Sequence, residues 1–312
     1  MNGKLKGGLF VFAGACSFGV LSTIVKLAYA EGYNVGHITG TQTLFGLLML
    51  WGIYLVQRRL MGVPPVIDAK MPATGKPTAW WKVAAAGSFT GLVGIFYYQA
   101  VQLVPASIAI ILLMQYLWMS ILIEWIAFGK RPHRMQVLSA AVVLVGTIFA
   151  GGIFSESVHV NPRGIVFGLL AALSYSVFLM TSGRVGNEYP PVKKSALMIT
   201  GSLILTWIIF PLTFLFDGIL FGGLYKWGLA LALLGAVVPP LFFSIGVPRV
   251  GVSLGAILSA AELPVAVMSS ALVLREDVQA LQWCGVILIL AAIGMTNLKM
   301  GRTANSVRGK TE

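Results

Sequence analysis

Ten apolar runs of membrane-spanning length recur along the chain and constrain its fold more than any other feature. They cover residues 8–28, 37–56, 81–102, 105–128, 135–153, 164–182, 195–216, 227–247, 251–273 and 280–298. As a helix, each run is long enough to cross a hydrocarbon core of about 30 Å. The runs do not alternate polar and apolar residues, as the strands of a membrane barrel do. The sequence therefore predicts an all-α integral membrane protein with ten transmembrane helices.

The basic residues indicate how such a chain is oriented. The net charge is +12, but only 10% of the residues are charged. If the N-terminus is cytoplasmic, the basic residues outside the cytoplasmic segments are Lys26, Arg163, Lys226 and Arg275. Short cytoplasmic loops are enriched in Lys and Arg. We therefore expect both termini in the cytoplasm, and we interpret the charge as an orientation signal that implies the lipid bilayer and no nucleic acid.

The sequence contains no pattern typical of an enzyme or a metal protein. Cys16 and Cys284 lie inside apolar runs, and His37, His133 and His159 lie at run ends or in connections. None has the spacing of metal ligands. No HExxH, nucleophile elbow or phosphate loop occurs. We therefore expect no catalytic residues, no metal site and no cofactor.

The two halves of the chain resemble each other weakly but in the same order. Residues 104–112 align with residues 250–258 at an offset of 146, and residues 17–19 pair with residues 174–176 at an offset of 157. Because five spans per half is an odd number, the second half must be inverted relative to the first. We predict a 5+5 inverted-topology repeat, with five-helix units at 7–153 and 164–298 and a cytoplasmic tail at 299–312.

An acid stands near the middle of the ninth run. Glu262 precedes Pro264, which cannot donate a backbone hydrogen bond and tends to kink a helix. A carboxylate at this depth requires a water-filled cavity, a partner or a proton, and no basic residue lies in the same run. We predict that Glu262 binds a positive group of the substrate or a coupling proton. The alternative is a neutral acid bonded to a neighbouring helix. Glu124, near a run end, is expected to pair with Lys130 or Arg131 in a structural role.

Other polar and aromatic side chains are expected around the same central cavity. The repeat alignment pairs Gln115 and Tyr116 with Ala261 and Glu262. An unpaired amide in lipid is costly, and aromatic faces beside a carboxylate can hold a cationic or zwitterionic solute. The predicted substrate-binding or coupling residues are Glu262, Gln115, Tyr116, Trp118, Ser17, Tyr175 and Lys26, with Pro264, Pro239 and Pro240 as kinks or hinges. Helix packing is the alternative for the aromatic and hydroxyl residues, and a reach to the outer interface is the alternative for Lys26.

Several short elements, taken in order, resemble the drug/metabolite transporter superfamily of the EamA type. They are Ser17-Phe18-Gly19, Lys26, the set Ser259, Glu262 and Pro264, the Leu-Arg-Glu-Asp end at Glu276, and Gln282-Trp283-Cys284-Gly285. The resemblance covers about residues 7–298. It implies export of small metabolites, often amino acids or toxic compounds, across a bacterial inner membrane without an ATP motor. Many members have an arginine early in the second span, where this chain has Gln42.

These observations together favour a secondary transporter. We expect it to export a small organic metabolite that is amino acid-like, cationic or zwitterionic, or aromatic, by alternating access. A non-transporting membrane receptor or scaffold is an alternative that would not need polar groups converging at mid-depth. An importer of the same solute class is another. A second copy of the chain is one candidate partner.

Overall fold

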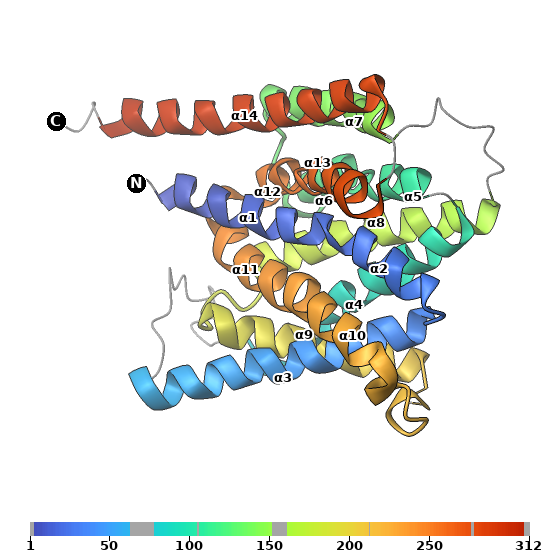
Figure 1. The fold of residues 1–312 in the computed structure, drawn as a ribbon. Coiled ribbons are helices and arrows are strands. Elements are labelled where there is room, and N and C mark those ends of the chain that lie inside the picture. Colours follow the sequence, from blue (N-terminus) through green and yellow to red (C-terminus); the bar gives the residue numbers. More distant parts are fainter. Residues whose placement is uncertain are drawn as a thin grey trace.

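The computed structural model describes residues 3–62, 78–104, 106–151, 161–211, 213–275 and 278–308, and these residues fold into helices without strands (Figure 1). The α-helices are α1 (Gly3–Gly19), α2 (Leu21–Ala30), α3 (Val35–Met61), α4 (Trp80–Leu103), α5 (Ala106–Leu113), α6 (Tyr116–Phe128), α7 (Arg134–Ala150), α8 (Pro162–Arg184), α9 (Pro191–Ile209), α10 (Tyr225–Leu231), α11 (Val238–Val250), α12 (Val252–Ser259), α13 (Glu262–Ser269) and α14 (Ala280–Arg308). Short 3-10 or π-helical segments lie at Thr213–Leu215, Leu220–Leu224, Ala232–Val237 and Ser270–Leu274.

Seven helical stretches in the described part of the chain are long and apolar enough to cross a membrane. They are Gly3–Ala30, Val35–Leu60, Ile108–Phe128, Pro162–Arg184, Pro191–Ile209, Leu220–Val250 and Val252–Leu274. Arg134–Ala150 and Ala280–Met295 are shorter apolar helices. The expectation of an all-helical, multi-pass membrane protein is therefore confirmed, whereas the count of ten spans stays a prediction.

Local sequence signals explain where several helices begin. The side chain of Asn34 accepts a hydrogen bond from the His37 amide at the start of α3. His133 and Gln136 form a reciprocal capping box at the start of α7. Asn161 caps α8. Such caps satisfy amides that have no acceptor within the helix.

Two helical stretches are broken at positions that correspond at the offset of 146. The first break separates α5 from α6 at Met114, and the second separates α12 from α13 at Ala260. At both breaks the amide three residues later bonds to that residue's carbonyl, Leu117 to Met114 and Leu263 to Ala260. In the second stretch Pro264 explains the break, because it cannot donate to Ala260, four residues earlier. The first stretch breaks at the same place without a proline.

Pro239 and Pro240, predicted as kinks or hinges, lie at a change in helix type. Both residues are buried in the first turn of α11, directly after the π-helical segment Ala232–Val237. Neither can donate a backbone hydrogen bond, so the carbonyls of the preceding turn lose their usual donors. Ser17 donates to one of the carbonyls in that segment, Leu234, at 2.7 Å.

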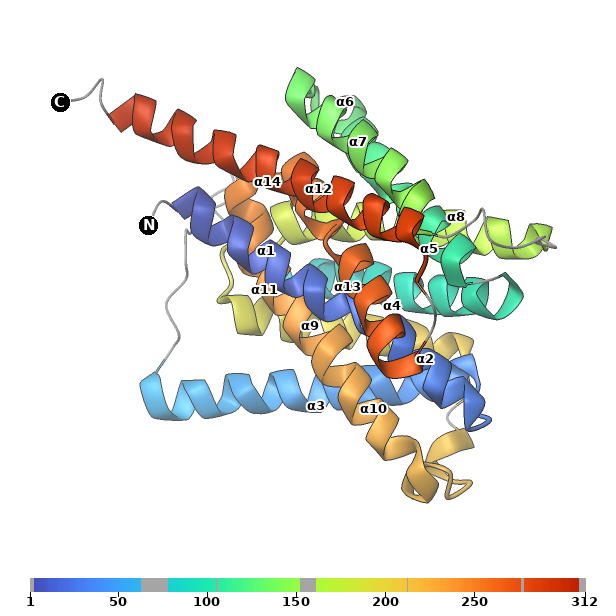
Figure 2. The ribbon, with the colours of Figure 1, turned by 45° about the horizontal axis from the view of Figure 1, so that its top comes forward.

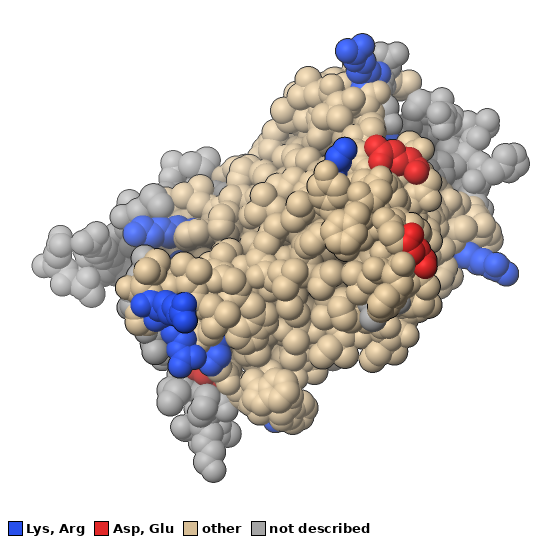
Figure 3. Space-filling model, turned by 60° about the horizontal axis from the view of Figure 1, so that its bottom comes forward, with Lys and Arg blue, Asp and Glu red and all other residues tan. Residues whose placement is uncertain are grey.

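The helices pack so that the two described ends of the chain lie on one side, which we call the terminal side. The start of α1 and the end of α14 both lie there (Figures 1 and 2). α1 packs along α11, α7 packs along α14, and α4 packs against both α8 and α9. On the face in Figure 3, charged side chains gather toward the ends and leave a broad uncharged surface between them. Such a surface suits the hydrocarbon region of a bilayer. The predicted tail at 299–312 continues α14 to Arg308, and residues 309–312 lie outside the described residues, as do residues 63–77 between α3 and α4.

Candidate functional site

A cavity of about 70 Å³ lies among α1, α2, α3, α4, α8, α9 and α13. Its wall is mostly apolar, with polar side chains at a few points. The polar residues among those described are Ser22, Thr39, Gln42, Thr43, Thr90, Tyr97, Tyr98, Tyr175, Ser202, Thr206 and Glu262. Glu262 is the one charged side chain in this described lining. The cavity thus combines a mostly apolar wall with a few polar groups and a single carboxylate, which is the usual composition of a ligand site.

Glu262 is held at the first residue of α13, just after the helix break. Its side chain is 4% exposed. One carboxylate oxygen, Oε2, accepts a hydrogen bond from the hydroxyl of Tyr175 at 3.3 Å. The other, Oε1, has no partner among the described residues. Because a buried acceptor without a partner is costly, Oε1 is available to a solute, a water molecule or a proton.

α1 comes unusually close to Glu262, and the sequence allows this approach through Gly19. A Cβ atom on Gly19 would lie 2.4 Å from the backbone carbonyl oxygen of Glu262. The neighbouring Phe18 packs edge-on against Tyr175, with ring centroids 5.8 Å apart. The Ser17-Phe18-Gly19 element therefore builds one wall of the cavity through Phe18 and Gly19, while Ser17 turns to the carbonyl of Leu234 and is absent from the lining.

Gln42 and Tyr98 line the cavity, although sequence reasoning did not assign them to a site. The hydroxyl of Tyr98 donates to Oε1 of Gln42 at 3.2 Å, and the hydroxyl of Tyr29 donates to the Tyr98 carbonyl at 3.2 Å. Thr39, Gln42 and Thr43 follow one another at the spacing of a single helix face. That polar face on an otherwise apolar run was the signal that could have identified them.

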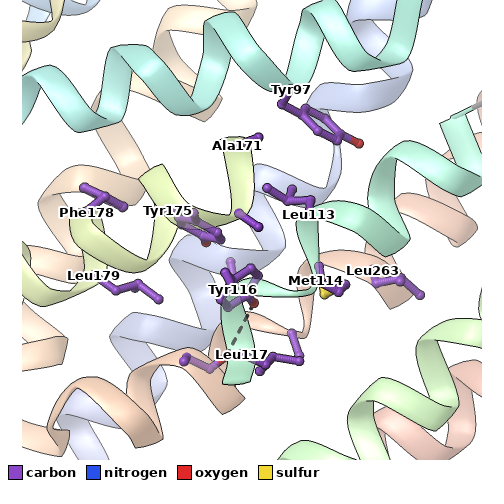
Figure 4. Close-up of a cluster of buried hydrophobic side chains, with 14 of the residues drawn as sticks. Tyr97, Leu113, Met114, Tyr116, Leu117, Ala171, Tyr175, Phe178, Leu179 and Leu263 are labelled. Carbon is purple, nitrogen blue, oxygen red and sulfur yellow. Dashed lines mark hydrogen bonds between the residues drawn. The ribbon is translucent and has the colours of Figure 1, made fainter. Parts of the chain in front are cut away.

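Tyr116 lies beside the cavity and not in its described lining. Figure 4 shows its ring against that of Tyr175, and the two ring centroids are 4.4 Å apart. Tyr116 is fully buried, and its hydroxyl donates to the carbonyl of Ala256 at 3.4 Å. The residue therefore supports Tyr175 and joins α6 to α12, which agrees with the packing alternative for its ring.

Gln115 and Trp118 are also absent from the cavity lining. The indole of Trp118 donates to Oε1 of Gln115 at 2.9 Å, and the Gln115 amide donates to the carbonyl of Ile111 at 3.0 Å. Trp118 is exposed and borders an apolar surface groove between α6 and α8. The expected convergence of these two residues on Glu262 is therefore not what the structure has, because the amide finds its partners within its own helical stretch.

Lys26 lies in a second cavity that adjoins the first. This cavity has a volume of about 100 Å³ and is also lined by Thr23, Ser270 and Gln282. The two cavities share Ser22, Tyr97, Ile110 and Ala266 as wall residues. The two adjoining cavities therefore place the acid Glu262 in one lining and the base Lys26, which is half-buried, in the other.

On the terminal side, a second buried carboxylate joins three helices. Glu124 of α6 is 2% exposed and bonds to Lys130 at 3.0 Å and to Arg184 of α8 at 3.3 Å. The Ser253 amide of α12 donates to it at 3.0 Å, and the Ser253 hydroxyl bonds to it as well. The expected pairing of Glu124 with Lys130 is confirmed. The contacts fasten the helices to one another on this side.

The connection between α8 and α9 adds further contacts on the same side. Lys194 is fully buried, and its ammonium donates to the Ser182 carbonyl and to Oδ1 of Asn187, both at 2.7 Å. Glu188 accepts a hydrogen bond from the Thr78 amide at 2.5 Å. Burial acts to raise the pKa of Glu188, but the hydrogen bonds from Thr78 and from its own backbone, together with the charge of Lys194, outweigh it and leave the pKa below its usual value.

No group of three or more His, Cys, Asp or Glu side chains that could hold a metal ion occurs among the described residues. The cavity is thus organised around one carboxylate and several hydroxyl groups. Such groups can bind an ammonium, exchange a proton or hydrogen-bond a polar solute.

Comparison with known proteins places the chain in a family. Residues 5–152 and residues 162–298 each match the EamA-like transporter family. The chain belongs to the EamA-like transporter family. The resemblance seen in the sequence is thereby confirmed, and this EamA-like protein is a membrane transporter and not an enzyme.

Related proteins agree with this assignment. The chain is 24% identical over 323 residues to the "Uncharacterized transporter YcbK" of Bacillus subtilis, a match covering 95% of each chain. It is 23% identical to the "Uncharacterized transporter sll1319" of Synechocystis over 95% of this chain and 94% of that one. The "Threonine/homoserine exporter RhtA" of Salmonella typhimurium is 25% identical over 66% of this chain and 67% of its own length. One crystal structure shares the fold with a TM-score of 0.69 at 18% identity, covering 94% of this chain and 97% of that one.

Proposed function

We propose that this protein is a secondary transporter that exports a small amino acid-like solute by alternating access. The observation that carries the proposal is the cavity in which Glu262 is buried, with one oxygen bonded to Tyr175 and the other without a partner in the part of the chain that the structure describes. A structural acid would be expected to have both oxygens satisfied. The free oxygen of Glu262 suits the positive group of a solute or a coupling proton.

The size and charge of the cavity support this substrate class. A buried water molecule needs roughly 10–15 Å³ of such volume, so a cavity of about 70 Å³ has room for roughly five water molecules. A small amino acid fits this space better than a large aromatic compound does. The carboxylate of Glu262 favours a solute with a positive group. The relative named as a threonine/homoserine exporter supports both an amino acid as substrate and the outward direction.

The arrangement of the helices supports a 5+5 inverted repeat of ten spans. α5 and α12 have eight residues each and end at breaks that correspond at the offset of 146. The two stretches that match the family, 5–152 and 162–298, have the bounds expected of two such units. Discontinuous helices that meet at a central site are typical of transporters with inverted repeats.

The proposal also includes how the protein is oriented in the membrane and to which side its cavity opens. The basic residues favour a cytoplasmic location for the terminal side, and the bacterial relatives favour the inner membrane. The contacts of Glu124 and Lys194 hold the helices together on the terminal side, whereas the cavity containing Glu262 adjoins a second cavity at Lys26. In the proposed cycle this conformation faces outward, and the contacts on the terminal side must break for the cavity to open to the cytoplasm.

The test is transport by purified protein in liposomes, with Glu262→Gln compared against Glu31→Gln. Glu31 is an exposed glutamate outside both cavities that bonds to Trp227, so its variant is a matched control. We expect wild-type protein and Glu31→Gln to exchange labelled amino acid in a pH-dependent manner. We expect Glu262→Gln to reach normal membrane levels but to lose exchange or its pH dependence.

Three results would contradict the proposal or part of it. Exchange by Glu262→Gln at the wild-type rate with the same pH profile would make Glu262 a packing residue. A complete absence of transport by wild-type protein across a panel of amino acids, polyamines and aromatic cations would favour a receptor or scaffold. In cells, accumulation of the solute on expression would contradict export and favour an importer.

A further inference from the structure

Three hydroxyl groups in the cavity wall have no hydrogen-bond partner among the described residues. They belong to Thr90, Ser202 and Thr206, and each hydroxyl oxygen is buried. Ser202 is 1% exposed, and Thr206 is fully buried. A buried hydroxyl group without a partner costs free energy, and such groups are uncommon in native structures. Three of them in one wall therefore point to something polar that occupies the cavity.

The three hydroxyl groups come from a single helix crossing. Ser202 and Thr206 are one turn apart on α9, and Thr90 is on α4. The two helices approach closely here, since a Cβ atom on Gly91 would lie 2.8 Å from Oγ of Ser202. This crossing fixes the positions of the three side chains, because α4 and α9 cannot slide past each other without a clash.

Other threonines in the same cavity show that free hydroxyl groups are not a general property of its helices. Thr39 donates to the Val35 carbonyl at 2.7 Å, and Thr43 donates to the Thr39 carbonyl at 2.9 Å. Such bonds to the preceding turn are the usual arrangement for threonine in an apolar helix. Thr206 lies in the last turn of α9 and makes no such bond in the structure.

The chemistry of the two walls is complementary to a zwitterion. α13 presents the free oxygen of Glu262, a negatively charged acceptor, whereas the α4–α9 crossing presents neutral hydroxyl donors. A carboxylate on the solute would be repelled by Glu262, but it would be bound by hydroxyl groups that have no other acceptor. A solute that carries both an ammonium and a carboxylate would satisfy all of these groups at once.

We propose that Thr90, Ser202 and Thr206 form a subsite for the carboxylate of the transported solute, while the free oxygen of Glu262 takes its ammonium. This inference rests on the proposed transport function and narrows it to zwitterionic amino acids. It also gives a role to residues on α4 and α9 that hold no charge.

The experiment compares matched pairs of solutes that differ only in the carboxylate. The probes are threonine with 1-aminopropan-2-ol, phenylalanine with phenethylamine, and lysine with cadaverine, measured by exchange in proteoliposomes. Loss of a hydrogen bond to a charged group typically changes affinity by about tenfold or more. We expect wild-type protein to prefer at least one amino acid over its amine by about this factor.

Two variants remove the hydroxyl groups and nearly conserve the side-chain volume. One is the double variant Ser202→Ala with Thr206→Val, and the other is Thr90→Val alone. We expect them to bring the ratio of acid to amine transport toward one while the rate for the amine is kept, which also shows that the protein is folded. The variant Thr206→Ser keeps a hydroxyl group at this position and should retain most of the preference for the amino acid over its amine. Thr147→Val is the control, because Thr147 is buried outside the cavity and bonds to the Val143 carbonyl.

The outcomes separate the two proposals. Equal transport of acid and amine by wild-type protein, or an unchanged ratio in the hydroxyl variants, would overturn the carboxylate subsite and leave transport itself intact. Absence of transport of every pair by wild-type protein would overturn the proposed function and the subsite with it.

Discussion

Substitution of Glu124 tests whether its buried contacts, and not its exposed ion pairs, hold the terminal side closed. The carboxylate accepts hydrogen bonds from both the amide and the hydroxyl group of Ser253, which is itself buried. Its ion-pair partners are more accessible, since the side chains of Lys130 and Arg184 are 57% and 36% exposed. The variants to compare are Glu124→Ala, Glu124→Gln and Lys130→Ala.

The three variants should lower the free energy of unfolding by different amounts, because the partners of Glu124 differ in burial. Glu124→Ala leaves the Ser253 amide without an acceptor, at a cost of about 1–3 kcal/mol, and leaves a small cavity as well. Exposed Lys130 can return to water, so Lys130→Ala should cost less than about 1 kcal/mol. Glu124→Gln keeps a carbonyl oxygen that can still accept from Ser253. It should therefore fall between the other two variants.

The assay is denaturant unfolding of the purified protein in detergent micelles at several ionic strengths. Unfolding is monitored by circular dichroism. We expect the free energy of unfolding to decrease in the order Lys130→Ala, Glu124→Gln, Glu124→Ala, with little dependence on salt for the last variant. Equal losses for Lys130→Ala and Glu124→Ala, both abolished by salt, would refute the reasoning. The ion pairs would then dominate, contrary to their exposure.

Two further predictions concern burial and close packing. An amine-acylating reagent applied to the folded protein should modify Lys193 and spare the fully buried Lys194, as measured by peptide mass spectrometry; equal labelling of both would contradict the burial of Lys194. Gly201→Ala should destabilise the protein by about 1–3 kcal/mol, because its Cβ atom would lie 1.7 Å from the Ala84 carbonyl oxygen. Gly52→Ala, where the structure has open space, should be tolerated, and equal stability of the two variants would argue against the α4–α9 contact.

The helical organisation was largely predictable because lipid leaves the backbone few choices. Each predicted apolar run overlaps a helical stretch in the described residues, although the run 195–216 extends past the end of α9 at Ile209, and the offset of 146 predicted from the sequence recurs at the two helix breaks. The break at Ala260 could be expected from Pro264. The break at Met114 could not, because no proline follows it, and only the repeat relates the two positions.

Gln115 and Trp118 do not line the cavity as expected, and the reason cannot be read from hydropathy. The argument was that a polar amide in lipid must face the protein interior. The structure satisfies the amide locally, through the Ile111 carbonyl and the Trp118 indole, so no interior partner is needed. Because a helix turns by 100° per residue, adjacent Tyr116 is buried while Trp118 is exposed.

The uncharged polar residues of the cavity wall could not be identified from the sequence. Ser202 and Thr206 are spaced one turn apart on a run rich in other small and hydroxyl residues, so nothing distinguishes them from packing residues. Their significance depends on whether the hydroxyl oxygen bonds to the preceding turn. That depends on how closely α4 approaches, which is a property of tertiary structure.

The contrast between the two buried acids carries the functional argument. Glu124 and Glu262 are both almost inaccessible, and burial alone would rank them together. Glu124 has donors from three other residues, so its charge is compensated and it has no need of a ligand. Within the described residues, the Glu262 carboxylate has one hydrogen bond, from Tyr175, its other oxygen has no partner, and a cavity adjoins it. A carboxylate placed this way is stable only with a proton or a cation beside it, and exchange between the two is what a coupled transporter requires.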